Sequence, residues 1–203
     1  MDALILVDIQ RDFLPGGTLP VPKGDEITPV VNRLQPHFDL VVATQDWHPQ
    51  DHASFASNHP GRKVYEKVLL RGLEQVLWPD HCVQGSAGAM FADNLQMNRV
   101  EAIFRKGMDP AIDSYSGFFD NGHLKFTGMG DYLKGRKVNR LYVVGLAADY
   151  CVYFTILDGL ELGFETVLIR DATRAISDLG FQSALKDIKL KGGKAILSRA
   201  ILK

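Results

Sequence analysis

The sequence contains only two cysteines, Cys82 and Cys151, and it shows neither the pattern of a secretory leader nor a long apolar run. It enters an apolar segment directly, with neither a basic stretch before that segment nor a small-residue cleavage site after it. No later run approaches the ~20 apolar residues that a membrane-spanning helix requires. We therefore expect a cytoplasmic protein, without membrane association, in which both cysteines are reduced thiols.

An excess of charge of one sign is lacking as well. The formal net charge is −1, and the sequence has no basic stripe, like-charge block or low-complexity tract. It therefore offers no electrostatic case for binding nucleic acid or an anionic membrane. No repeat or linker divides the chain, and 203 residues suffice for one full core. We expect a single domain, residues 1–203, with a small neutral molecule as its partner and with its oligomeric state left open.

Short apolar runs alternate with segments typical of helices. The runs resemble buried parallel strands, whereas the helical segments begin near residues 28, 131, 149 and 178. Such alternation predicts an α/β fold, a three-layer α/β/α sandwich with a mostly parallel central sheet and right-handed crossovers. The strands are expected at residues 3–7, 40–44, 100–104, 141–145, 166–169 and 194–197.

The segment at about 46–98 shows poor periodicity and several turn clusters. Irregular connections longer than ~12 to 15 residues are uncommon and usually functional. The segment also contains four of the six histidines, namely His48, His52, His59 and His81. We interpret it as an insertion that covers a site.

Cys151 stands where a buried strand leads into an amphipathic helix. Asp149 is expected to be the N-cap of that helix, and Gly163 its C′ residue. A thiol at a helix N-terminus meets the positive end of the helix dipole, so its pKa should fall below the usual value of about 8.5 unless apolar surroundings enclose it. The alternative is a buried, inert helix cysteine.

Chemically active residues also follow the other strands. Asp8, Asp46 and Lys106 each lie at or just beyond a predicted strand's carboxyl end, and Cys151 follows a fourth strand. Ligands bind at that edge of parallel sheets, so these residues should converge. An ammonium would favour the thiolate, and a carboxylate would move the thiol proton. Taken singly, Asp8 could instead be a cap or salt-bridge partner, and Lys106 a solvated charge.

Asp46 and His48 are two residues apart and point the same way in extended backbone. With a histidine from the insertion they would form a site for one divalent transition metal, for which zinc, iron and manganese are all suitable. The alternatives are a loop cap for the Asp-x-His pair and hydrogen-bonded loop histidines for His52 and His81.

Five motifs resemble those of one family in order and spacing, over nearly the whole chain. They are VDIQRDFLPGG, TQDWHP with DHASF, WPDHCVQGSAGA, Lys106-Gly107 followed by YSGF, and GLAADYCV. These look like the motifs of the nicotinamidases, also called pyrazinamidases, within the isochorismatase-like cysteine hydrolases. The thiol and acid motifs occur across that superfamily, whereas the Asp-x-His signature with WPDHC marks the nicotinamidase branch.

The resemblance implies roles for individual residues. It implies a catalytic triad of Asp8, Lys106 and Cys151. It places a non-proline cis peptide at Leu146-Ala147, with the Ala147 and Cys151 N–H groups as an oxyanion hole. Metal ligands would be Asp46, His48 and His81, while His52 matches a position that ligates in only some members. The walls around the substrate ring would be Phe13, Trp78 and Tyr115. Tyr150 stands where members vary and often carry histidine.

The implied activity is metal-dependent hydrolysis of nicotinamide to nicotinate and ammonia through a cysteine thioester, with pyrazinamide as a further substrate. Its implied setting is NAD salvage, and its implied cofactor is one divalent ion, with zinc the first choice. Two alternatives stay open. One is a related superfamily hydrolase acting on another small amide, and the other is an inactive metal-binding protein.

Overall fold

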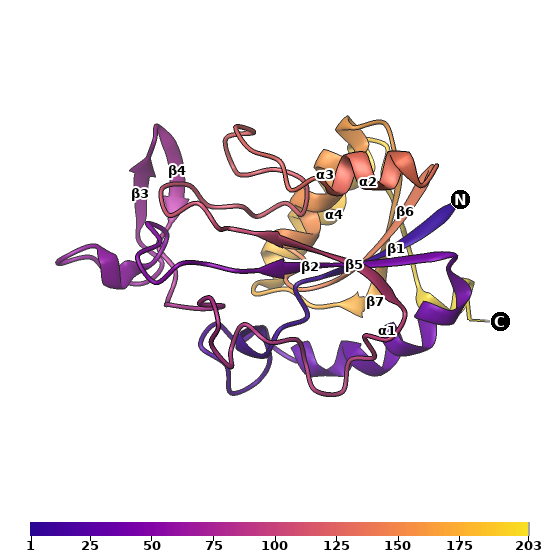
Figure 1. Cartoon of the computed structure of the whole chain (residues 1–203), viewed down its shortest axis with the longest axis horizontal. Helices are drawn as coiled ribbons and strands as arrows, with labels where there is room; N and C mark the ends of the chain where they lie inside the picture. Colours follow the sequence, from indigo (N-terminus) through magenta and orange to yellow (C-terminus); the bar gives the residue numbers. More distant parts are fainter. Residues whose placement is uncertain (203) are drawn as a thin grey trace.

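A computed structural model describes residues 1–202 and centres on a six-stranded sheet (Figure 1). The strand order is β5-β2-β1-β6-β7-β8, and every neighbouring pair is parallel. All six predicted strands are present, and the sheet is parallel throughout rather than mostly parallel. The bounds are β1 (Asp2–Val7), β2 (Leu40–Asp46), β5 (Val100–Lys106), β6 (Arg140–Gly145), β7 (Glu165–Thr173) and β8 (Lys194–Ile196).

Helices cover both faces of the sheet, which confirms the three-layer architecture. Along β1, Leu4 and Leu6 point into one core with α1 (Thr28–Leu34), where Pro36 follows in a short 3-10 turn. Ile5 and Val7 point into the other core. That core holds α2 (Met129–Gly135), α3 (Cys151–Glu161) and α4 (Asp178–Leu190), which lie on the opposite side of the sheet in Figure 1. Within residues 1–202 no helix combines the length and apolar character of a membrane span.

The strand order reverses between β1 and β6. The chain first builds outward from β1 through β2 to β5, and then returns to place β6 on the other side of β1. Gly145 ends β6 at φ +118°, and a Cβ there would lie 2.0 Å from the Val7 carbonyl oxygen. Only glycine allows so close an approach. The ends of β1 and β6 therefore meet at the crevice where open parallel sheets bind ligands.

The insertion, which joins β2 to β5, is largely irregular, as predicted. It nevertheless contains an antiparallel hairpin, β3 (Lys67–Leu70) and β4 (Leu73–Val76), that the sequence did not predict. In Figure 1 the hairpin stands beyond the end of the central sheet. Its hydrophobic residues are exposed or only partly buried, as with Leu69 at 75% exposure and Val76 at the edge of a core, so its pattern of alternation is weak.

The expected caps of α3 are half confirmed. Gly163 has φ +89° directly after the C-cap, as predicted. The prediction for Asp149 was wrong, because Tyr150 is the N-cap residue and no side chain caps this helix. The Asp149 carboxylate accepts the N–H groups of Ile176 and Ser177 instead, so it joins α3 to the segment before α4.

Candidate active site

The four residues predicted at strand ends meet around the Lys106 ammonium. Its Nζ lies 2.9 Å from Asp8 Oδ2 and 3.5 Å from Cys151 Sγ. It also donates to Asp46 Oδ1 at 3.0 Å and to the Ser114 carbonyl at 2.8 Å. All of these side chains are buried. The parallel pairing of β1, β2, β5 and β6 thus brings Asp8, Asp46, Lys106 and Cys151, which are far apart in the sequence, into contact with one another.

Burial and charge act in opposite directions on Lys106 and Asp8. Burial alone would lower the pKa of Lys106, but Asp46 and Asp8 outweigh it and hold that pKa well above its usual value. Burial raises the pKa of Asp8, and the nearby ammonium only partly offsets this. Asp8 Oδ1 accepts the Thr44 hydroxyl at 2.6 Å. The site therefore pairs a permanent cation with a carboxyl group suited to exchanging a proton.

Cys151 is the first residue of α3, as predicted, but its pKa is shifted in the opposite direction to that expected. Burial raises the pKa of the thiol well above 9.0, and the carboxylates of Asp8 and Asp46 add to the effect that Lys106 opposes. The two carboxylates of Asp8 and Asp46 thus oppose ionisation of the thiol, and the single ammonium of Lys106 favours it. In the free protein the side chain is therefore a neutral thiol.

Two backbone N–H groups beside Sγ are available to a ligand. Tyr150 and Val152 both donate to the Ala147 carbonyl at 3.1 Å. Within residues 1–202 neither the intervening Cys151 N–H nor the Ala147 N–H has a hydrogen-bond partner. The Leu146-Ala147 peptide is cis, as the resemblance implied. A carbonyl oxygen placed here could accept two hydrogen bonds, which is the arrangement of an oxyanion hole.

Asp46, His48 and His81 offer three ligand atoms within 4.8 Å of one another. Asp46 Oδ2 lies 3.1 Å from His48 Nε2 and 3.5 Å from His81 Nε2. Although burial would raise the pKa of Asp46, His48 and Lys106 hold it well below its usual range. The carboxylate is therefore ionised and ready to ligate.

The remaining atoms of these side chains fit a divalent metal. The Nδ1 atoms of His48 and His81 contact the carbonyls of Gly107 and Pro79 at 2.9 and 2.7 Å, which assigns the proton to Nδ1 and turns the Nε2 lone pair inward. His48 Nε2 is buried without a hydrogen-bond partner. Gly107 has φ +68°, and a Cβ there would lie 2.3 Å from the His48 ring. The predicted ligands therefore converge, and their donor set suits a divalent transition metal.

His52 lies beside this set with a different hydrogen-bond pattern. Its ring centroid is 4.3 Å from that of His48. The Ser54 N–H donates to His52 Nδ1 at 3.2 Å, whereas His52 Nε2 is buried without a hydrogen-bond partner. His48, His52 and Asp113 also offer ligand atoms within 4.8 Å of one another, so His52 lies beside a second candidate ligand group. Burial lowers the pKa of His52 to about 4, and His48 adds to this effect.

A pocket with about 340 Å³ of empty space, mouth included, opens onto Sγ. The three residues expected to surround a ring, Phe13, Trp78 and Tyr115, all line it. Tyr150 lines it as well, with its ring 4.9 Å from that of Trp78. Three further lining residues were not predicted from the sequence, namely Leu19, Asp113 and Ile176. For Asp113 a signal existed, because a buried acid just before the YSGF motif could have been suspected.

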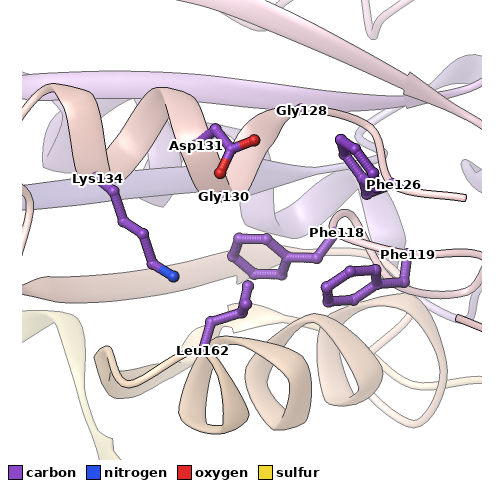
Figure 2. A pocket seen from close by; sticks show the side chains of 8 residues that line it. All are labelled: Phe118, Phe119, Phe126, Gly128, Gly130, Asp131, Lys134 and Leu162. Carbon is purple, nitrogen blue, oxygen red and sulfur yellow. The ribbon is translucent and has the colours of Figure 1, made fainter.

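A second hollow lies between α2, α3 and the loop before α2 (Figure 2). Phe118, Phe119 and Phe126 point into it, with Lys134 at one side. It contains about 600 Å³ of empty space, more than the pocket at Cys151. None of its lining residues is a thiol or a histidine, so it offers neither a nucleophile nor a metal site.

Comparison with known proteins agrees with this geometry. The isochorismatase domain pattern matches residues 2–200. The nicotinamidase of Escherichia coli is 48% identical over 86% of this chain and 84% of its own length. The nicotinamidase of Acinetobacter baylyi is 43% identical over 98% of this chain and 94% of its own length.

Solved structures match equally well. A nicotinamidase/pyrazinamidase of Acinetobacter baumannii superposes with a TM-score of 0.96 at 43% identity, covering 98% of this chain and 97% of its own. The yeast nicotinamidase bound to the inhibitor nicotinaldehyde superposes with a TM-score of 0.92 at 32% identity, covering 97% of this chain and 100% of its own. The pyrazinamidase of Pyrococcus horikoshii in complex with zinc superposes with a TM-score of 0.80 at 40% identity, covering 97% of this chain and 98% of its own.

Proposed function

Since the chain belongs to the isochorismatase domain family, we propose that it is a nicotinamidase, an amidohydrolase that converts nicotinamide to nicotinate and ammonia. One observation carries the proposal. A buried Asp8-Lys106-Cys151 cluster opens onto an aromatic pocket that also contains Asp46 and His81 of the metal set. A thiol, a proton carrier and a ring site within one cavity are what hydrolysis of an aromatic carboxamide needs.

In the first half of the reaction, Cys151 Sγ attacks the carboxamide carbon and its proton passes to Asp8. The oxyanion that forms accepts hydrogen bonds from the Ala147 and Cys151 N–H groups. Asp8 then gives the proton to the nitrogen as the C–N bond breaks, releasing ammonia and leaving a thioester. The raised pKa of Asp8 suits both transfers, because burial makes this carboxylate a stronger proton acceptor than an exposed aspartate.

In the second half, Asp8 removes a proton from water, which attacks the thioester carbon. The C–S bond breaks, Cys151 regains the proton from Asp8, and the product leaves as nicotinic acid, which loses its proton to water and becomes nicotinate. Lys106 keeps its charge throughout, since its pKa is held well above 10.5. It stabilises the developing thiolate at 3.5 Å.

Asp46, His48 and His81 would hold one divalent ion, and we propose zinc, with iron or manganese as alternatives. When bound, the ion supplies a Lewis-acidic point that binds the ring nitrogen, directly or through water, and so orients the ring. The zinc complex of the Pyrococcus protein supports this choice. We assign His52 a supporting role beside the ligands. Phe13, Trp78 and Tyr115 would surround the ring.

Further properties follow as parts of the same proposal. Pyrazinamide presents the same ring nitrogen and carboxamide, so it should also be cleaved. We propose a role in NAD salvage in the cytoplasm, where the two free thiols would stay reduced. We also propose that residues 1–203 act as one domain whose insertion at about 46–98 covers the site.

The test is ammonia release from nicotinamide by the zinc-loaded protein, the Cys151→Ala variant and a chelated sample. We expect turnover that falls at least ~10³-fold in the variant and drops on chelation. Cys82→Ala is the matched control for removing a thiol, because Cys82 is buried but is not among the residues that line the pocket. Zinc binding without turnover would contradict the proposal and favour either an inactive metal-binding protein or a hydrolase of another small amide.

A further inference from the structure

The β3–β4 hairpin contacts the substrate pocket through one side chain. Of residues 67–70 and 73–76, only Gln75 is buried, at 3% exposure. Its neighbours Leu69 and Leu73 are 75% and 37% exposed. Hairpins normally attach by their apolar residues. Here the side chain that is fully buried is a polar amide. Burying an amide costs free energy unless it is hydrogen-bonded, so the hydrogen-bond partners of Gln75 should show why it is buried.

The partners of Gln75 are walls of the pocket. Its Nε2 donates to Asp113 Oδ2 at 2.9 Å and to Tyr115 Oη at 3.1 Å. It also contacts the Val76 carbonyl at 2.8 Å. Asp113 and Tyr115 both line the pocket above Cys151, and the triad side chains do not contact Gln75. Gln75 therefore reaches the ring-binding wall without touching the reacting groups.

Tyr115 connects the same network to Trp78, which also lines the pocket. Its Oη accepts the Trp78 indole N–H at 3.2 Å as well as the Gln75 amide. The two rings lie nearly perpendicular, at 84°, with centroids 6.4 Å apart. Because both partners are donors, the phenol oxygen is fixed between them. Loss of the Gln75 amide would therefore release the Tyr115 hydroxyl from one of its two donors.

Asp113 depends on Gln75 in a similar way. Its Oδ1 accepts the Ser114 N–H at 2.8 Å, and its Oδ2 accepts the Gln75 amide. The side chain is buried, so losing one donor would leave an uncompensated carboxylate oxygen beside the pocket. That oxygen would draw the residue 113–115 segment towards water.

We propose that Gln75 is a positioning residue for the substrate ring, through which the hairpin sets the width of the pocket and its preference for a single ring. The proposal rests on the nicotinamidase function proposed above. It assigns a role in ring selectivity to a hairpin that carries neither a catalytic group nor a metal ligand.

The test compares Gln75→Met with Glu74→Ala. Methionine keeps the length and packing of the side chain and removes only the amide. Glu74 is an exposed neighbour on the same strand, and its replacement removes the ion pair to Lys67. For Gln75→Met we expect KM for nicotinamide to rise about tenfold with kcat within about threefold, since hydrogen bonds to the wall are lost and the triad is untouched. Glu74→Ala should change neither by more than about twofold.

Two further readouts separate positioning from general destabilisation. The ratio of kcat/KM for nicotinamide to that for a bicyclic carboxamide, quinoline-3-carboxamide, should fall at least about fivefold in Gln75→Met. Tyr115→Phe should raise KM similarly. In the double variant the rise in KM should be smaller than the product of the two single effects, because both substitutions remove the hydrogen bond between Gln75 and Tyr115.

The inference is overturned if the KM of Gln75→Met for nicotinamide is the same as that of Glu74→Ala, or if the ratio of kcat/KM values is unchanged. It is also overturned if the rise in KM in the double variant equals the product of the rises in Gln75→Met and Tyr115→Phe. Should Gln75→Met be too unstable to assay, Tyr115→Phe decides by its selectivity ratio alone. Failure of the unaltered protein to release ammonia would instead count against the nicotinamidase function, so the two failures are distinct.

Discussion

The Cys151 thiol should react slowly in the free protein. Burial and two carboxylates raise its pKa well above 9.0, so alkylation by iodoacetamide should be slow at pH 7 and still increase above pH 9. Removing one of those charges with Asp8→Asn should speed alkylation at pH 8 by about tenfold, the effect of roughly one pKa unit. Mass spectrometry of time points from pH 6 to 10 gives the rates.

This measurement needs Cys82→Ala as its background, since burial also raises the pKa of the Cys82 thiol well above 9.0. A rate for Cys151 that reaches its plateau below pH 7 would mean that a thiolate-ammonium pair exists at rest. The proton transfer from Cys151 to Asp8 would then precede substrate binding rather than accompany attack.

At the scale of elements, the turn after β5 positions a metal ligand. In Gly107→Ala the new methyl would lie 2.3 Å from the His48 ring, so the ring must move and lose its contact with the Gly107 carbonyl. We expect zinc affinity to fall about 10- to 100-fold, as when other supporting contacts of metal ligands are lost. Competition with a chelator measures this.

Gly72→Ala is the matched control for the backbone effect. Gly72 has φ +81°, but nothing lies within 4 Å of its ideal Cβ. This variant should lose some stability and keep its zinc affinity. Equal affinities in both variants would show that the Gly107 turn does not hold His48 in place.

What the sequence could predict at this scale depended on periodicity. Six apolar runs predicted the strands, and the strand ends located Asp8, Asp46, Lys106 and Cys151 at one edge. The hairpin was missed because its one buried residue is polar. The direction of the Cys151 pKa was wrong because it depends on how many carboxylates tertiary packing brings near, which local sequence does not contain.

For the molecule as a whole, His52 should contribute to acid sensitivity. Its pKa is lowered to about 4 in the folded protein, against about 6.5 when unfolded. Between these values the unfolded chain binds one more proton, so the free energy of unfolding should fall as pH decreases from 6.5 to 4. The contribution is about 1.4 kcal/mol for each pH unit from this one proton.

Urea denaturation of the metal-free protein at pH 6.5, 5.5 and 4.5 gives these free energies. Other groups titrate in the same range, so the informative quantity is the difference between the unaltered protein and His52→Gln. That difference should shrink as pH falls, because only the unaltered protein loses this contribution. A difference independent of pH would contradict a neutral, buried His52.

The reversal of strand order between β1 and β6 also governs when reactivity arises during synthesis. Asp8, Asp46 and Lys106 lie on strands made early, which pair with one another in β5-β2-β1. The thiol follows β6 and joins them only when that late strand docks against β1. Pairing across so great a sequence separation is a slow step. A nascent chain therefore carries the acid and the ammonium but no nucleophile, and it becomes competent for chemistry only on completion of its central sheet.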